Sequence, residues 1–161
     1  MKDLAALYER YAGDVYRFAF YLTGNRPNAE DIVSETFLRV WSARDDLRLA
    51  TVRSYLFAIA RNIHLQGRRR AWRSAPLPDG LPDPGPGPAA TAEGRSELAA
   101  VLKSLGELSE PDRAALLMRA CGELSYREIA AALGISEPAA KVKVHRARLK
   151  LAPLRPEREE P

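Results

Sequence analysis

Apolar side chains recur every three or four residues in the N-terminal part of the chain, which is the spacing of one face of an α-helix. This face comprises Leu4, Tyr8, Tyr11, Val15, Phe18 and Leu22. Residues 24–27 interrupt the pattern, and Asn28 is then expected to cap a second helix. Glu30 and Asp31 would lie in its first turn, where the helix dipole favours anions. The pattern predicts two consecutive helices with a break between them.

Two further stretches predict the rest of an N-terminal helical domain. The second helix is expected to bury Ile32, Val33, Thr36, Phe37, Val40 and Trp41. Its outward residues are then Asp31, Ser34, Glu35, Leu38 and Arg39. The pattern breaks over residues 45–51, and a third helix is expected to face inward with Val52, Tyr55, Leu56, Ile59 and Ile63. This helix runs out into the arginine-rich segment 68–73.

A segment rich in proline and glycine divides the chain. Nine of the thirteen residues from position 76 to position 88 are Pro or Gly. Proline removes backbone donors and glycine removes stiffness, so this composition is typical of a linker rather than of a helix. A long ordered surface loop is the alternative. The sequence predicts an all-α protein, with helical domains over residues 1–75 and 95–153 and an exposed linker over 76–94.

The second domain begins with two short helical patterns. Leu98, Val101, Leu102 and Leu105 form the first apolar stripe. Ser109 is expected to cap the next helix, with Pro111 in its first turn. This helix is expected to bury Leu116, Leu117 and Ala120.

The following segment carries the pattern of a helix-turn-helix. Ser125 and Glu128 have the spacing of a capping box, and Gly134 can end the helix because glycine adopts positive φ at low cost. Ser136 is expected to cap another helix two residues later, with Pro138 in its first turn. Two short helices joined by a tight glycine turn are typical of DNA-binding proteins.

The last helix has two different faces. Its inward residues are expected to be Ala140, Val144, Ala147 and Leu151. The opposite face is expected to hold Ala139, Val142, Lys143, Arg146 and Lys150, flanked by Lys141 and Arg148. Five bases and no acid lie between positions 141 and 150. A solvated basic face is common on any helix, but such a band also suits phosphates and purine edges in the major groove.

Composition narrows the class of protein. Apolar residues make up 46% and charged residues 29% of the chain, the balance of a soluble globular protein. The sequence contains no run long enough for a transmembrane helix and no apolar core of a secretory signal. The single cysteine excludes an internal disulfide, and no His or Cys spacing suggests a metal or another cofactor. We therefore expect a cytoplasmic, cofactor-free protein without membrane insertion, and its net charge of +4 permits a nucleic-acid partner.

Three separated motifs resemble one protein family in order and spacing. They are NAEDIVSETFLRVW at 28–41, SYLFAIARN at 54–62 and GELSYREIAAALGISEPAAKVKVHRARLKL at 122–151. Together they resemble the bacterial RNA polymerase sigma factors of the extracytoplasmic-function (ECF) type. The resemblance implies a promoter-specificity subunit that initiates transcription. Its first domain would bind core polymerase and the minus-10 element, and its second domain the minus-35 element.

The resemblance also implies two sets of site residues in the first domain. The core-binding set, which would dock on the clamp coiled coil of the largest polymerase subunit, is Asp31, Ser34, Glu35, Leu38 and Arg39. The minus-10 set is Leu47, Arg61, Asn62, Gln66, Arg68, Arg69 and Arg70. Ser34, Leu47 and Gln66 stand where the family frequently has Gln, an aromatic residue and Asp. Amides suit the edges of unpaired bases, and arginines suit phosphates.

In the second domain the resemblance places the minus-35 site on the helix-turn-helix from Tyr126 to His145 and beyond. The implied set is Ala139, Lys141, Val142, Lys143, His145, Arg146 and Lys150. Arg146 is expected to read guanine and Lys143 to bind a phosphate, since only arginine offers a bidentate fork. Other implied partners are the flap region of the polymerase and an anti-sigma factor. His64 and Cys121 are expected to be structural, whereas Trp72 suits an apolar plug and base stacking equally.

Two other functions compete with this interpretation. A free-standing helix-turn-helix repressor or activator would explain the second domain, but not the motifs at 31–44 and 61–66. An enzyme such as a nuclease would need a carboxylate cluster, a metal-ligand spacing or a nucleophile–base set, and the sequence shows none. We therefore expect a non-enzymatic DNA-binding protein.

Overall fold

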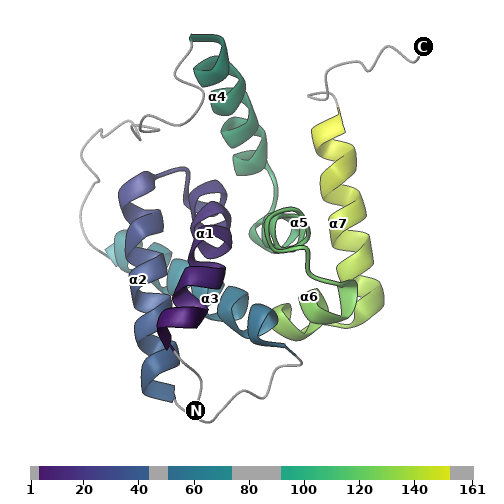
Figure 1. Ribbon diagram of the computed structural model, residues 1–161. Coiled ribbons are helices and arrows are strands. Elements are labelled where there is room, and N and C mark those ends of the chain that lie inside the picture. The colour runs from purple at the N-terminus through teal and green to yellow at the C-terminus, as the bar shows by residue number, and fades with distance from the viewer. Residues whose placement is uncertain (1–3, 44–50, 74–91, 153–161) are drawn as a thin grey trace.

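The computed structural model describes residues 4–43, 51–73 and 92–152, and within these ranges the chain forms seven helices and no strand (Figure 1). The helices are α1 (Leu4–Thr23), α2 (Arg26–Ala43), α3 (Val52–Arg73), α4 (Ala92–Glu107), α5 (Glu110–Gly122), α6 (Tyr126–Leu133) and α7 (Glu137–Leu151). The all-α prediction is confirmed. Among the described helices, none is long and apolar enough to span a bilayer.

The turn between α1 and α2 corrects the predicted cap. Gly24 adopts φ +68°, a left-handed conformation that favours glycine. The side chain of Asn25 accepts a hydrogen bond from the backbone N–H of Asn28 at 2.9 Å, and α2 begins at Arg26. Asn28 therefore lies inside the first turn and does not cap the helix, because the chain turns three residues earlier than its apolar pattern suggests.

The α1–α2 pair packs through a row of buried residues that ends before Trp41. Phe37 is buried, and its ring meets that of Tyr8 edge-on at 5.0 Å between centroids. Tyr8 is itself 51% exposed, and Trp41, one turn beyond Phe37, is 49% exposed. The prediction that Trp41 faces inward is wrong, since Phe37 and Val40 face the core at this end of α2 and Trp41 is turned toward solvent.

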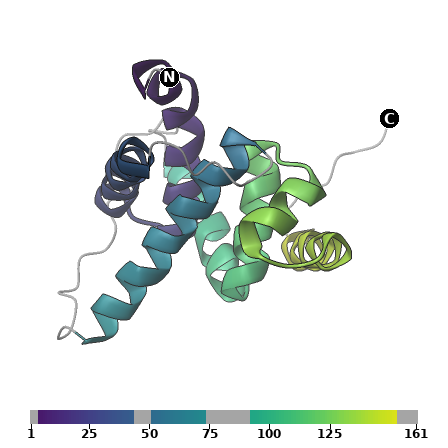
Figure 2. The ribbon, with the colours of Figure 1, turned by 90° about the horizontal axis from the view of Figure 1, so that it is seen from below.

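Helix α3 is buried on more sides than its apolar stripe predicts. Leu56 and Ile63 face inward as expected, but Phe57 and Ser54 are also fully buried or nearly so. The additional contact comes from the second domain, since α3 packs against α5 and α6 as well as against α1 and α2. Figure 2 shows the N-terminal end of α3 lying against α6. The two domains therefore share one continuous hydrophobic core.

The second domain is arranged around α5, which Figure 1 shows end-on between α1 and α7. Ser109 caps α5, with Pro111 in the first turn as predicted. Helix α4 begins at Ala92, so residues 92–94 are helical and do not belong to the predicted linker. The rest of the linker, 76–91, lies outside the described residues.

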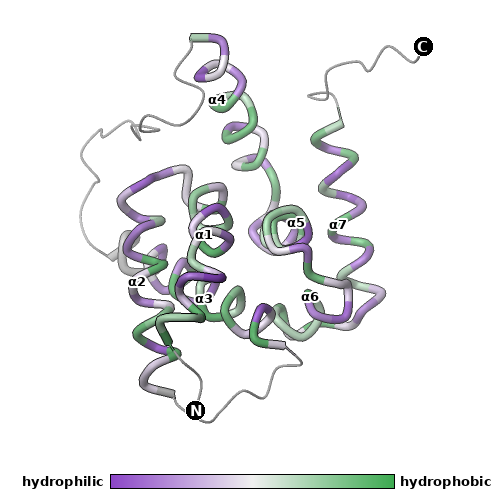
Figure 3. The backbone as a smooth tube through the Cα atoms, in the orientation of Figure 1, coloured by the Kyte–Doolittle hydropathy of each residue, from purple (hydrophilic) through white to green (hydrophobic). Residues whose placement is uncertain are grey.

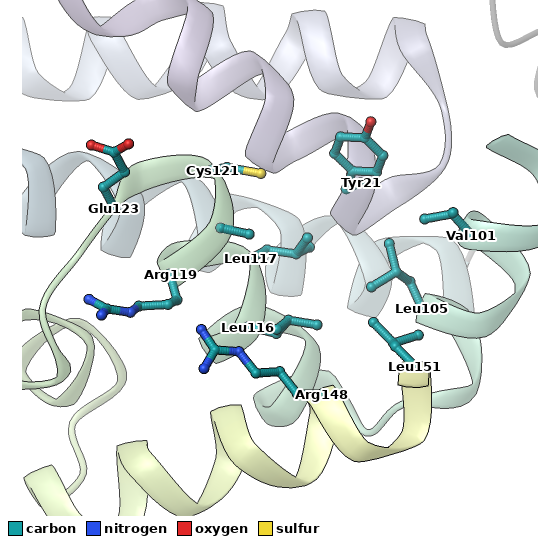
Figure 4. A pocket seen from close by; sticks show the side chains of 11 residues that line it. Tyr21, Val101, Leu105, Leu116, Leu117, Arg119, Cys121, Glu123, Arg148 and Leu151 are labelled. Atoms are coloured by element: carbon teal, nitrogen blue, oxygen red, sulfur yellow. The ribbon is translucent and has the colours of Figure 1, made fainter. Parts of the chain in front are cut away.

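One expectation about α5 is wrong. Ala120 is exposed, whereas its neighbours Leu116 and Leu117 are buried. The reason is that Ala120 lines an open groove between α1, α4, α5 and α7 (Figure 4). The apolar pattern of α5 marks residues that face other helices, but it does not show where those helices leave a gap.

Candidate nucleic-acid interface

The helix-turn-helix is built from local capping interactions. The hydroxyl of Ser125 accepts a hydrogen bond from the N–H of Glu128 at 3.1 Å, and the Glu128 carboxylate accepts one from the N–H of Ser125 at 3.0 Å. Gly134 ends α6 with φ +68°. Ser136 caps α7 by accepting from the N–H of Ala139 at 3.2 Å. Each of these local features agrees with its sequence signal.

Helix α7 has one buried and one exposed face, and Figure 3 shows hydrophobic and hydrophilic positions alternating along it. Ala140, Val144 and Ala147 are fully buried against the rest of the domain. Val142 is 57% and Leu149 is 62% exposed. The exposed hollow on this face has a volume of about 530 Å³ and is lined by Lys141, Val142, His145, Arg146, Leu149 and Lys150. Leu149 was missed by the sequence analysis, although its spacing of seven residues from Val142 places both on one face.

Two of the predicted minus-35 residues are tied to a buried acid. Asp112 of α5 is only 3% exposed, and its carboxylate accepts hydrogen bonds from Arg146 Nε at 2.9 Å and from Arg146 Nη2 at 3.1 Å. Lys143 Nζ lies 3.8 Å from the same carboxylate and is 23% exposed. Lys143 and Ala139 are half-buried rather than fully outward. Lys141, Val142, His145, Arg146 and Lys150 are exposed as expected.

The predicted minus-10 residues on α3 do not share one environment. Arg61 forms a two-pronged ion pair with Glu110 of α5, with Nε–Oε1 at 2.8 Å and Nη2–Oε2 at 2.7 Å. These side chains are 16% and 11% exposed, so the pair lies within the contact between the domains. Asn62, Gln66 and Arg68 are exposed on the same helix.

Part of the minus-10 set cannot be placed. Leu47 lies outside the described residues. The backbones of Arg69, Arg70 and Trp72 belong to α3, but their side chains lie outside the described part of the chain.

The predicted polymerase-binding residues of α2 lie together on its outer side. Asp31, Ser34 and Glu35 are exposed, and Leu38 is 64% exposed, so this side of α2 presents an apolar side chain beside two acids. Arg39 donates to Glu35 and to the side-chain oxygen of Gln66 on α3, each at 2.8 Å. The exposed face of α2 therefore continues onto the exposed face of α3.

Two titratable side chains in the interior are held neutral. The pKa of His64 on α3 is lowered to about 4 by burial and, next, by the nearby Arg68 guanidinium. Its Nε2 atom is buried without a hydrogen-bond partner among the described residues. Burial raises the pKa of the Cys121 thiol to about 11. Within the described residues, His, Cys, Asp and Glu nowhere form a cluster of three that would hold a metal ion.

An apolar groove of about 750 Å³ separates α4 from α5 and α7. Figure 4 shows Tyr21, Val101, Leu105 and Leu151 gathered at one end, and Arg119 and Arg148 at the other. The groove is distinct from the exposed face of α7 and from the exposed face of α2.

Comparison with known proteins matches both domains. The family model described as Sigma-70 region 2 matches residues 7–74, and the one described as Sigma-70, region 4 matches residues 98–151. The ECF RNA polymerase sigma factor SigM of Bacillus subtilis is 30% identical over 153 residues, which cover 92% of this chain and 92% of its own length. SigE of Mycolicibacterium smegmatis is 33% identical over 90% of this chain, and SigG of Mycobacterium tuberculosis is 30% identical over 96%. This chain spans only 58% and 49% of the lengths of these two relatives.

Solved structures show the same arrangement of helices. CnrH, in complex with the cytosolic domain of CnrY, superposes with a TM-score of 0.68 and 28% identity over 94% of this chain and 86% of CnrH. The sigma factor RpoE of Bartonella quintana, in complex with the anti-sigma factor NepR, shares the fold with a TM-score of 0.72 and 24% identity, over 96% of this chain and 97% of RpoE. The protein belongs to the extracytoplasmic-function family of RNA polymerase sigma factors.

Proposed function

We propose that the protein is a non-enzymatic promoter-specificity subunit that acts in the cytoplasm, binds core RNA polymerase, recognises minus-10 and minus-35 elements and initiates transcription. One observation carries the proposal. Within a single chain whose domains match sigma regions 2 and 4, the outer face of α2 and the basic face of α7 are both left exposed. A free-standing regulator would need the second face but not the first.

The minus-35 element is proposed to bind the exposed face of α7. Lys141 and Lys150 are exposed cations on this helix and suit phosphates. Val142, 57% exposed, suits the methyl group of thymine. Arg146 suits a guanine edge, since its side chain remains 52% exposed while it pairs with Asp112. The major groove is wide enough to admit this helix with its exposed face toward the base edges.

The first domain is proposed to bind the clamp coiled coil of the polymerase through α2 and the melted minus-10 strand through α3. The hydrogen bond from Arg39 to Gln66 joins the exposed faces of α2 and α3. It supports a single surface on which the coiled coil and the melted strand would lie side by side. Asn62 and Gln66 offer amides to the edges of unpaired bases, and Arg68 offers a charge to phosphate. Arg61, whose side chain is only 16% exposed in its ion pair with Glu110, can join them only when that pair opens.

The groove in Figure 4 is proposed to receive an anti-sigma factor. The relative CnrH is known in complex with the cytosolic domain of CnrY, and RpoE with the anti-sigma factor NepR. The groove combines apolar walls from four helices with the cations Arg119 and Arg148, so it suits an amphipathic helix carrying acidic residues.

Run-off transcription tests the proposed function directly. Purified core polymerase is combined with this chain and a pool of promoter fragments, and transcript starts are sequenced. We expect starts at a common pair of elements only when the chain is added. Specific DNA binding by the chain alone, without any core-dependent transcript, would instead support the free-standing regulator.

A further inference from the structure

We propose that Asp112 is a positioning residue: from α5, it aims the Arg146 guanidinium at one base pair of the minus-35 element. The inference rests on the proposed function, and it assigns a specificity role to a residue outside the helix-turn-helix. Asp112 precedes α7 by more than twenty residues, so no motif of the recognition helix points to it.

The geometry of the ion pair leaves one edge of the guanidinium available. Asp112 accepts from Nε at 2.9 Å and from Nη2 at 3.1 Å, which is a side-on pair. A guanidinium carries five N–H groups in a planar fork, so this pair leaves the edge formed by Nη1 and the second N–H of Nη2. None of the contacts among the described residues uses Nη1. Two parallel donors on one edge are what guanine O6 and N7 require for a bidentate contact.

The exposed fractions of the two side chains show that Asp112 is held in the interior and that Arg146 faces solvent. The Asp112 side chain is 3% exposed and the Arg146 side chain 52%. Asp112 lies in the first turn of α5, where the helix dipole favours a carboxylate, and its N–H is held by Ser109. An arginine anchored at Nε loses less rotamer freedom when it meets a base than one that swings freely in solvent.

Lys143 completes the arrangement. Its Nζ lies 3.8 Å from Asp112 Oδ1 and its side chain is 23% exposed, so it shares the carboxylate with Arg146. This second cation balances the buried carboxylate if the guanidinium shifts toward DNA. The alternative is an ion pair that only fastens α7 onto α5, which pack against each other. The two roles differ in what they do to base preference.

The test uses holoenzyme assembled from the full chain and core polymerase. Wild-type holoenzyme first selects its minus-35 sequence from a randomised duplex library, and binding to all single-base variants of that sequence is then measured. Arg146→Ala should reduce the preference at one position by about tenfold or more. Asp112→Asn should reduce the preference at that same position by roughly three- to tenfold and leave the other positions unchanged. Arg146→Lys keeps a cation beside Asp112 but has no fork, so it should lose the preference as well.

A double mutant separates positioning from stability. In the Arg146→Ala background, Asp112→Asn should cause no further change in base preference, whatever it does to the Tm. Equal weakening at every position by Asp112→Asn, or an intact preference together with a lowered Tm, would overturn the inference. If Asp112→Asn does not fold, the same measurement is made on Asp112→Glu, which displaces the carboxylate by one methylene. This variant should also reduce the preference at the position that Arg146 reads. A wild-type holoenzyme without any minus-35 preference would instead overturn the proposed function itself.

Discussion

At the scale of single residues, His64 links the interior of the first domain to pH. Its pKa of about 4 lies below the ordinary value of 6.5, first because of burial and then because of Arg68. Arg113 and Arg61 lower it further, whereas Glu110 raises it. The folded protein therefore favours the neutral imidazole. The neutral state of His64 contributes fully to the free energy of unfolding above about pH 6.5. This contribution is lost as the pH falls toward 4.

We expect the Tm to fall between pH 6.5 and pH 4 because protonation is more favourable in the unfolded chain than in the folded one. His64→Gln should remove part of this fall, since glutamine does not titrate. Thermal melts at several pH values measure the effect. The exposed His145 provides the matched control: His145→Gln should leave the pH profile of the wild type unchanged. Identical profiles for the wild type and His64→Gln would contradict the assignment.

Gly122 allows a close approach between the two domains. A Cβ atom at this position would lie 2.7 Å from Phe57 Cζ and 2.5 Å from Leu124 Cδ1. Gly122→Ala should therefore lower the free energy of unfolding by about 1–3 kcal/mol, the usual effect of overpacking. Gly106→Ala in α4 is the control, because nothing lies within 4 Å of its Cβ position. The control should raise stability by about 0.5–1 kcal/mol. Urea titration measures both, and equal effects would argue against the tight contact.

The sequence predicted the exposure of the candidate-site residues but not their ion-pair partners. Exposure follows from neighbouring residues, whereas the partners lie far away along the chain. Exposure of Lys141 and Val142 follows from helical periodicity alone. The partners of Arg61 and Arg146 are Glu110 and Asp112, which lie 49 and 34 residues away. A local sequence pattern places Arg61 and Arg146 at the spacing expected of DNA-binding residues. It does not show that each of them is already paired with an acidic side chain of another helix.

At the scale of elements, the same rule separates what the sequence predicts from what it misses. The capping box, the turn glycine and the serine cap of α7 are local, and the structure has all three. The second buried face of α3 depends on packing against α5 and α6, so its amphipathic pattern predicts only the first face. The start of α2 at Arg26 depends on the turn chemistry of Asn25, which the pattern of apolar residues does not contain.

The outer face of α2 provides the prediction for polymerase binding. Asp31 and Glu35 are exposed, and the ion pair between Glu35 and Arg39 is a surface pair of small worth. Asp31→Ala/Glu35→Ala should therefore leave the Tm within about 1 °C, and it should weaken binding to core polymerase by about tenfold. Fluorescence anisotropy with labelled protein measures the Kd.

The charge-matched control is Glu9→Ala/Glu97→Ala, since both acids are exposed on other helices. The control should bind core polymerase like the wild type. Equal binding by the α2 double mutant and the wild type would show that another face docks on the polymerase.

At the scale of the whole molecule, polar contacts fasten the domains beside their shared apolar core. Arg61 pairs with Glu110, and the hydroxyl of Ser54 donates to the backbone oxygen of Glu128 at 3.0 Å. Arg113 Nη1 donates to the backbone oxygen of Leu22 at 3.2 Å. Arg61, which the family resemblance assigns to DNA, is therefore part of the contact between the domains. Because its side chain is only 16% exposed in this arrangement, Arg61 cannot reach DNA while it pairs with Glu110.

Breaking the Arg61–Glu110 pair should open the molecule. Glu110→Gln leaves the Arg61 side chain, which is 16% exposed, without its counter-charge, and an uncompensated buried charge costs about 3–5 kcal/mol. Each domain retains its own helices, so the expected result is separation of the domains rather than loss of helix. Small-angle X-ray scattering should show a larger radius of gyration than for the wild type, with unchanged helical circular dichroism. Glu107→Gln, an exposed acid at the end of α4, is the control and should scatter like the wild type. An unchanged radius for Glu110→Gln would mean that the apolar contact of Phe57 with the region of Gly122 is sufficient to hold the domains together.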